Sequence, residues 1–142
     1  MKTALILLAL LVAAGAAWVR LAPSDPARWH VDPAGAVPGP GRYVAGPGGD
    51  RPPLPGGTDT LSRLAALAGA TPRTRVLAGS PAEGRITWIT RSRLWGFPDY
   101  TTAALCGPDG AEVCIHARLR FGRDDLGVNR ARVEGWLAAL GA

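Results

Sequence analysis

Two cysteines and one histidine lie where they could form a disulfide or hold a metal ion. Cys114 and His116 stand two positions apart in an alternating run, so both side chains point to one side of a β-strand. A preceding turn brings Cys106 to the same side. If the turn is a four-residue loop, Cys106 faces Cys114 and a disulfide becomes possible; if Gly110 forms a bulge, Cys106 is diagonal to it. Disulfide and free thiols both stay open, whereas three soft ligands without a fourth predict no metal site.

Carboxylates are the other candidates for acid–base chemistry. Asp99 follows a proline in a predicted turn, whereas Asp124 and Asp125 lie in a loop after the strand that carries His116. The sequence has no Gly-x-Ser-x-Gly, no carboxylate pair at helical spacing and no histidine-rich motif, so we assign no catalytic residue. Asp99, Asp125 and Asn129 are more typical of residues that bond turns and cap helices.

Arginines dominate the positive charge, because fifteen of the sixteen basic residues are Arg. We expect neighbouring strands to align four of them into a basic surface that suits a carboxylate, a lipid phosphate or an acidic loop of a partner. The interpretation that we favour is that Arg118 and Arg120 pair with Asp125 and fasten its loop to the sheet. The predicted ligand-binding residues are Arg91, Arg93, Asp99, His116, Arg118, Arg120, Asp125 and Asn129.

A predicted hairpin positions most of these side chains. Residues 100–106 and 111–121 flank Gly107-Pro108-Asp109-Gly110, whose residue types favour a tight turn. The second strand alternates, which predicts one buried face and one wet, basic face. The buried face carries Val113, Ile115, Ala117, Leu119 and Phe121, and the wet face carries Glu112, Cys114, His116, Arg118 and Arg120.

The remaining pattern predicts an α+β domain at residues 58–142. β-Branched and aromatic residues indicate strands at 74–79 and 85–91, and helical spacing indicates helices at 58–68 and 129–140, the second capped by Asn129. We expect an antiparallel sheet of about four strands with two helices packed on one face, a two-layer sandwich. Its core should come from Trp88, Trp95, Phe97, Phe121 and Trp136.

Residues 1–22 are typical of a signal peptide or a signal-anchor transmembrane helix. Lys2 precedes 16 residues without a charge, Ala4 to Val19, a length between a signal-peptide core and a full span. The small residues 14–16 suit cleavage, while Trp18 and Arg20 suit the end of an uncleaved helix. We expect a single-pass inner-membrane protein with its domain in the periplasm, or alternatively a protein secreted to the periplasm after cleavage.

Residues 23–57 are rich in proline and glycine, which predicts a linker that holds the domain clear of the bilayer. Residues 25–33 interrupt it with Trp29, His30 and Val31. We interpret this patch as an apolar plug that docks onto the domain, with a partner-binding motif as the alternative. The net charge of +5 comes without a basic run or a reader motif, so it does not indicate nucleic acid.

Three stretches together resemble the bacterial DUF1499 family. They are residues 91–99 (Arg-Ser-Arg-Leu-Trp-Gly-Phe-Pro-Asp), the strand of Arg118 and Arg120, and residues 122–130 (Gly-Arg-Asp-Asp-Leu-Gly-Val-Asn-Arg). The similarity covers about residues 60–140, and the leader and linker look like those of the membrane-anchored members. The family often has Ser between the strand arginines, where this chain has Ala117 and Leu119, so no role of those hydroxyls is implied. The resemblance implies fold and location, not a chemistry.

Two classes of function follow from these observations. The first is a non-enzymatic binding or accessory module of the cell envelope, which meets an anionic lipid or a protein partner through its basic sheet face. The alternative is a hydrolase-like envelope enzyme with its site around His116 and the Asp125 loop. A closed pocket between face and loop favours the enzyme and a flat basic sheet favours the module. We favour the module, membrane-bound through its N-terminal segment, and expect no cofactor.

Overall fold

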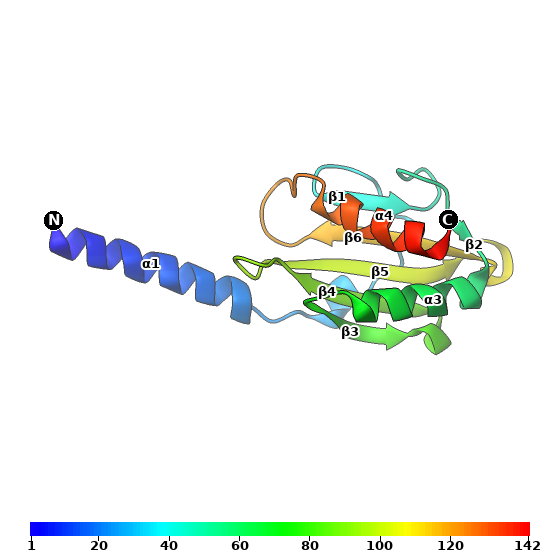
Figure 1. The fold of residues 1–142 in the computed structure, drawn as a ribbon, viewed down its shortest axis with the longest axis horizontal. Coiled ribbons are helices and arrows are strands. Elements are labelled where there is room, and N and C mark those ends of the chain that lie inside the picture. Colours follow the sequence, from blue (N-terminus) through cyan, green and yellow to red (C-terminus); the bar gives the residue numbers. More distant parts are fainter.

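An antiparallel sheet of six strands organises the computed structural model, which describes residues 1–142 (Figure 1). The strands are β1 (Arg42–Ala45), β2 (Leu54–Pro55), β3 (Thr74–Ser80), β4 (Arg85–Arg91), β5 (Pro98–Cys106) and β6 (Glu112–Leu119). Their order is β1-β6-β5-β4-β3, and β2 pairs with the same edge of β6 as β1. The helices are α1 (Lys2–Leu21), α2 (Pro26–Trp29), α3 (Gly57–Ala70) and α4 (Val128–Leu140), and two short 3-10 turns are η1 (Pro81–Glu83) and η2 (Pro108–Gly110).

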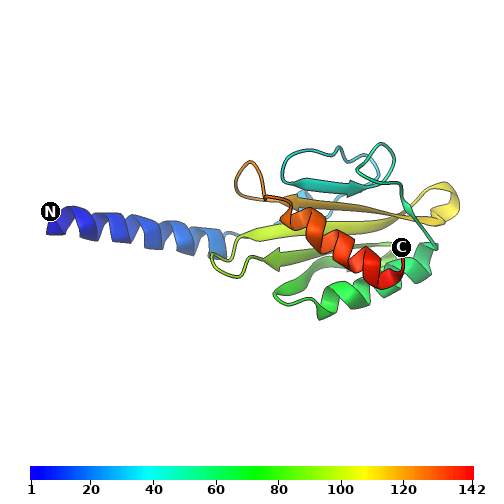
Figure 2. The ribbon, with the colours of Figure 1, turned by 45° about the horizontal axis from the view of Figure 1, so that its top comes forward.

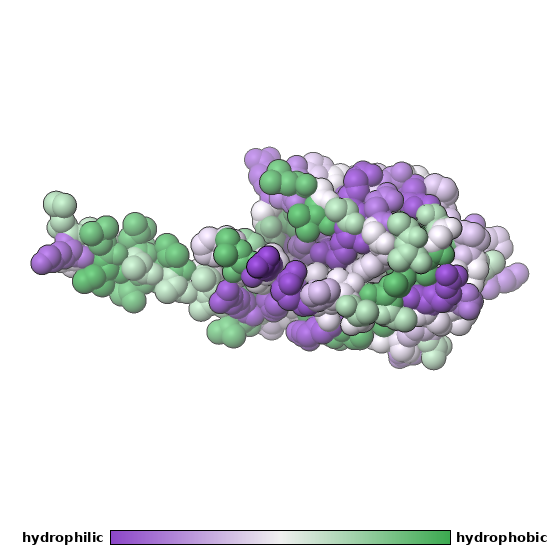
Figure 3. Space-filling view, viewed as in Figure 1, coloured by the Kyte–Doolittle hydropathy of each residue, from purple (hydrophilic) through white to green (hydrophobic).

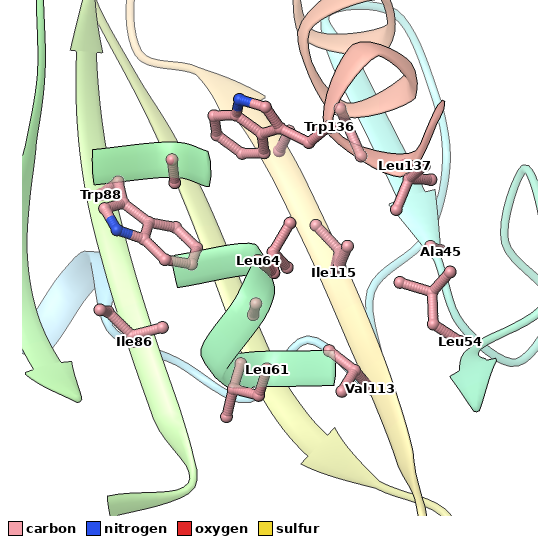
Figure 4. Packing of buried hydrophobic residues seen from close by; sticks show 14 of the residues in the cluster. Ala45, Leu54, Leu61, Leu64, Ile86, Trp88, Val113, Ile115, Trp136 and Leu137 are labelled. Carbon is pink, nitrogen blue, oxygen red and sulfur yellow. The ribbon is translucent and has the colours of Figure 1, made fainter. Parts of the chain in front are cut away.

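The α+β class is confirmed, and the main core lies where the alternation of β6 places it. Helices α3 and α4 cover one face of the sheet (Figure 2). Val113, Ile115 and Ala117 of β6 are completely buried on that face. Trp88 of β4 meets Trp136 of α4 edge to face, with ring centroids 5.9 Å apart (Figure 4). Aromatic pairs in this geometry stabilise the core beyond the area that they bury.

The opposite face of the sheet is not wet, which corrects the sequence-based expectation. The segment between α1 and β1 passes behind the sheet in Figure 1 and carries α2 with it. Trp29 at the end of α2 stacks on Tyr100 of β5, with ring centroids 3.8 Å apart and planes inclined by 8°. Cys114 and His116 are buried on this face. The patch around Trp29 is therefore a plug that docks onto the domain, as the apolar side chains among the prolines indicated.

Residues 23–57 are not the simple linker that the sequence predicted. Their second half supplies β1 and β2, which pair with β6, and the register of β1 sets Val44 opposite His116. Without them β6 would end the sheet as an open edge, with unpaired backbone groups. Tyr43, Val44 and Ala45 are completely buried, so this short apolar run is strand in spite of the glycine and proline around it. The predicted count of four strands was low for this reason.

Two of the expected core aromatics lie on the surface. Trp95 is 51% exposed and Phe97 39% exposed, both in the loop between β4 and β5. This loop and the loop between β6 and α4 lie at the end of the domain from which α1 extends (Figures 1 and 2). We call this the helix-side end. Helix α1 has 20 residues, a mean hydropathy of 2.3 in its most apolar window and no buried residue, so it has the length and composition of a membrane span or a signal sequence.

We predict that Trp29→Ala destabilises the full-length protein by about 3 kcal/mol, because it removes a buried aromatic side chain. Thermal unfolding in a mild nonionic detergent measures this. Trp136→Ala, in the main core, should cost about as much. Trp95→Ala is the control, and its exposed side chain should change stability by no more than about 0.5 kcal/mol. A Trp29→Ala protein that melts like the wild type would mean that the plug contributes nothing to the fold.

Candidate functional site

Arg118 holds the plug onto the sheet. Its Nη2 donates a hydrogen bond of 2.9 Å to the backbone carbonyl of Trp29, and its guanidinium lies 5.0 Å from the centroid of the Trp29 ring. The hydroxyl of Thr102 donates to the same carbonyl at 3.1 Å. Burial lowers the pKa of Arg118, and the nearby Arg42 and Arg28 lower it further. The carbonyl and the ring therefore stabilise a cation that has no carboxylate beside it.

Arg120 bonds the N-terminal segment closer to α1. Its Nη1 donates to the carbonyl of Pro23 at 2.9 Å, to the carbonyl of Ala22 at 3.4 Å and to the hydroxyl of Tyr100 at 3.1 Å. The hydroxyl of Ser24 is 2.7 Å from that of Tyr100. The pairing of Arg118 and Arg120 with Asp125 that we favoured is therefore wrong, because both guanidiniums bond carbonyls of the N-terminal segment.

The two other predicted arginines lie at the helix-side end. Arg91 donates through Nη1 to the carbonyl of Gly96 at 2.8 Å and to that of Val19 at 3.5 Å, whereas Arg93 is exposed and makes no side-chain hydrogen bond. In the other direction, Arg20 of α1 donates to the carbonyls of Leu94 at 3.2 Å and Trp95 at 3.3 Å. The flat basic sheet surface that the sequence predicted is thus occupied by the chain itself.

Cys106 and Cys114 are joined by a disulfide on the plug-covered face. Cys106 is paired with Glu112 and Cys114 with Ala104, so the cysteines are diagonal neighbours, with Cα atoms 5.9 Å apart. Of the two registers that the sequence left open, the diagonal one forms, and its Cα spacing lies within the usual range for a disulfide. His116 is buried nearby, and burial, followed by Arg118 and Arg42, lowers its pKa to about 4. A neutral, enclosed imidazole here is part of the packing of this face.

Asp125 organises the loop before α4. Its carboxylate accepts hydrogen bonds from the backbone N–H of Gly127 at 3.1 Å and of Asn129 at 2.7 Å, and from Asn129 Nδ2 at 2.6 Å. Asn129 is completely buried in the first turn, and its Oδ1 accepts from Arg132. The prediction that Asn129 caps this helix was therefore wrong: Asp125 accepts from the free N–H groups, and Asn129 links it to Arg132.

A hollow of about 380 Å³ opens beside this loop, between the start of β5, the end of β6 and the start of α4. Its apolar wall is formed by Phe97, Leu119, Phe121 and Val128, and its polar side by Ser92, Asp99, Asp124 and Asp125. The rings of Phe97 and Phe121 are 6.2 Å apart. We call it the helix-side hollow, because it lies in the two loops next to α1.

Asp99 is the carboxyl group with an unusual environment in this hollow. Burial raises its pKa to about 6; Arg132 opposes the rise, and Asp125 adds to it. The guanidinium of Arg132 lies 3.7 Å from Asp99 Oδ2, and hydrogen bonds from Arg132 and Asn129 lower the pKa of Asp99. A carboxylate has about four acceptor sites, so Asp99 keeps accepting capacity beside the hollow.

The structure brings together only part of the predicted site. Asp99 and Asp125 line the helix-side hollow, and Asn129 bonds Asp125 behind it. The side chains on the plug-covered face are those of His116, Arg118 and Arg120. His116 and Asp125 are thus separated by the sheet, and the hydrolase-like site predicted around them is not assembled. Sequence reasoning missed Arg132, although Asn129, Arg132 and Trp136 stand at helical spacing on one side of α4.

We predict that Asp99 makes the protein less stable as the pH rises. Its pKa of about 6 in the folded state lies above the ordinary value of 3.8, so stability present below pH 4 is lost as the pH passes 6. Asp99→Asn lacks this loss, and its melting temperature relative to wild type should rise between acidic and neutral pH. His116, whose lowered pKa acts in the opposite direction, is common to both proteins. Parallel melting curves across this range would contradict the assignment.

Comparison with known proteins agrees with the resemblance noted in the sequence. No curated protein and no solved structure matches the chain. The model of one family, described as "Protein of unknown function (DUF1499)", matches residues 50–140. The match covers β2 to β6, α3 and α4, including both loops of the helix-side hollow. The chain therefore belongs to the DUF1499 family.

Proposed function

We propose that the protein is a membrane-anchored, non-enzymatic accessory module of the cell envelope, with its domain exported and its helix-side end resting on the lipid surface. The observation that carries this proposal is the junction between α1 and the domain. Arg20 of α1 donates to carbonyls of the β4–β5 loop, and Arg91 donates to the carbonyl of Val19 in α1. Arg120 donates to the carbonyls of the two residues that follow α1. A helix fastened in this way does not leave the domain on a free tether.

The side chains of the helix-side end suit contact with lipid. Leu94 is 74% exposed and Leu126 94% exposed, one in each loop, and Trp95 and Val128 are about half exposed beside them. In Figure 3, α1 is largely apolar, and at the end of the domain next to it apolar residues lie among hydrophilic ones. An interfacial surface combines apolar residues that enter the acyl boundary with tryptophan at the headgroups.

Exposed arginines at the same end add an electrostatic contribution. Arg20 at the end of α1, Arg93 in the β4–β5 loop and Arg123 in the β6–α4 loop are all exposed. Each basic side chain near an anionic surface contributes about 1 kcal/mol of attraction. The anionic-lipid partner considered from the sequence therefore has a better location here than on the sheet face, which the plug occupies.

Export is supported by the disulfide and by α1. A Cys106–Cys114 bond persists in an oxidising compartment such as the periplasm, and α1 suits either a signal-anchor or a signal peptide. We favour the uncleaved anchor in the inner membrane, because the last residues of α1 are bonded into the domain. Cleavage followed by release into the periplasm is the alternative.

We predict that a reporter fused after Ala142 is outside the cytoplasm. Alkaline phosphatase, which folds only after export, should be active, and a fluorescent protein that requires the cytoplasm should be dark. The mass of the purified protein should include residues 1–16, since the anchor is retained. An inactive phosphatase with a bright cytoplasmic reporter would overturn the topology, and loss of those residues would replace the anchor by a cleaved signal.

We predict that the helix-side end is in contact with lipid when the full-length protein is in proteoliposomes. Leu94→Cys and Leu126→Cys, labelled with an environment-sensitive dye, should give blue-shifted emission and resist quenching by aqueous iodide. The native cysteines are paired, so the dye reports one position. Thr58→Cys, at the exposed start of α3 on the opposite end, is the matched control and should stay accessible. Equal quenching at all three positions would contradict the orientation.

A further inference from the structure

The helix-side hollow has features that contact with the lipid surface alone does not require. A lipid-contacting loop needs exposed apolar side chains, but it needs neither a concave wall nor a half-enclosed carboxyl group. The hollow has both, with a volume of about 380 Å³. This volume falls within the range of about 300–1,000 Å³ that is usual for small-molecule sites.

We propose that the helix-side hollow binds a single-chain amphiphile from the membrane, with an uncharged, hydroxyl-bearing head that donates a hydrogen bond to Asp99. The inference rests on the proposed orientation of the domain, since only then does the hollow open toward lipid. It names the class of molecule that this end of the domain takes up.

The apolar wall supplies the site for the chain of the amphiphile. Phe97, Leu119, Phe121 and Val128 line the hollow, and the lining is apolar over most of its area. Leu119 is the last residue of β6, Phe121 follows two positions later, and both are partly buried, while Val128 is the first residue of α4. The wall is therefore preformed, and binding need not order it.

A second, smaller hollow of about 110 Å³ lies between this end of the domain and α1. It is lined by Trp95, Phe97 and one side of the helix, where Val12, Gly15, Ala16 and Val19 stand at helical spacing. Phe97 lines both hollows. Small residues at Gly15 and Ala16 leave room beside the helix, so an acyl chain that lies along α1 in the bilayer meets Phe97 at its end. The position of the second hollow against α1 is why we take the membrane as the source of the ligand.

The polar side of the hollow selects the head. Its ionisable lining residues are Asp99, Asp124 and Asp125, and no arginine is among them. Asp125 is engaged with its own loop, and Asp124 accepts from the backbone N–H of Leu126 at 2.9 Å. Arg132 and Asn129 are the hydrogen-bond partners of Asp99 in the fold, and its carboxylate, with about four acceptor sites, keeps accepting capacity beside the hollow that it lines. A hydroxyl donates to it, whereas a carboxylate or phosphate head is repelled by the acidic lining.

Photo-crosslinking in nanodiscs tests the proposal on the full-length protein. The probes are a monoacylglycerol with a diazirine on a twelve-carbon chain and the fatty acid with the same chain, each at the same mole fraction in phosphatidylcholine. Peptide mapping should place the monoacylglycerol label on the wall of the hollow, and unlabelled monolauroylglycerol should compete. At a pH of about 9, where the fatty acid is ionised even in the bilayer, it should label the wall roughly tenfold less, because its head is charged. Equal labelling by both probes would overturn the assignment of the head.

Two variants separate binding in the hollow from lipid that merely surrounds α1. Val128→Trp fills the hollow and should abolish the label there, whereas Val76→Trp, an equal change at an exposed position on β3, should not. Asp99→Asn keeps the shape and should reduce the tenfold preference for the monoacylglycerol. Labels confined to α1, or a wall label that survives Val128→Trp, would overturn the proposal.

The dye-labelled positions 94 and 126 keep the two proposals apart. If those positions are in contact with lipid and the wall is not labelled, the amphiphile site is wrong and the orientation stands. If they are exposed to water and quenched by iodide, the orientation itself is wrong, and the amphiphile site fails with it.

Discussion

The stacking of Trp29 on Tyr100 is the contact on which the rest of the arrangement depends. It covers the sheet face that alternation in β6 marks as polar, and it turns Arg118 from a surface residue into one that bonds the Trp29 carbonyl. A buried guanidinium needs a partner, and a carbonyl and an aromatic ring provide one at a smaller desolvation cost than a second buried charge. The plug and the arginines therefore stabilise one another, and His116 and the disulfide are enclosed as a consequence.

The covered face also determines how α1 meets the domain. Because Trp29 fixes the segment after α1, the carbonyls of Ala22 and Pro23 come within hydrogen-bond distance of Arg120. Arg20 donates from α1 to the β4–β5 loop, and Arg91 donates from the domain to α1. Each of these bonds, exposed or partly buried, contributes little alone. Together they set the direction from which α1 enters, and with it the end of the domain that carries Leu94, Leu126 and the hollow.

The sequence predicted the parts of the fold that follow local periodicity. The central hairpin, β3, β4 and both covering helices lie within a few residues of their expected positions, because period and turn chemistry are local signals. It did not predict β1 or the covered face, because a strand of four residues among glycine and proline is defined by its partner β6. Of the predicted site residues, Asp99 and Asp125 line the hollow, whereas His116 lies on the opposite face of the sheet. Their grouping depends on which face each side chain takes, and for His116 the decisive contact is made by Trp29.

Several of the partly buried arginines donate to backbone carbonyls, and this affects the electrostatic field of the domain. Arg91, Arg118 and Arg120 bond neutral carbonyls, and the ion pairs of the structure involve only Arg51, Arg130 and Arg132. A carbonyl stabilises a guanidinium without cancelling its charge, so the domain keeps its positive field although the sheet face is covered. Arg20, Arg93 and Arg123 add to that field at the helix-side end, where an anionic bilayer would be attracted. The acidic lining of the hollow is surrounded by these exposed arginines. Under the proposed orientation, anionic lipid would be favoured around the opening and disfavoured within it, and this separation of charge is the physical reason why the surface and the hollow would select different molecules from one membrane.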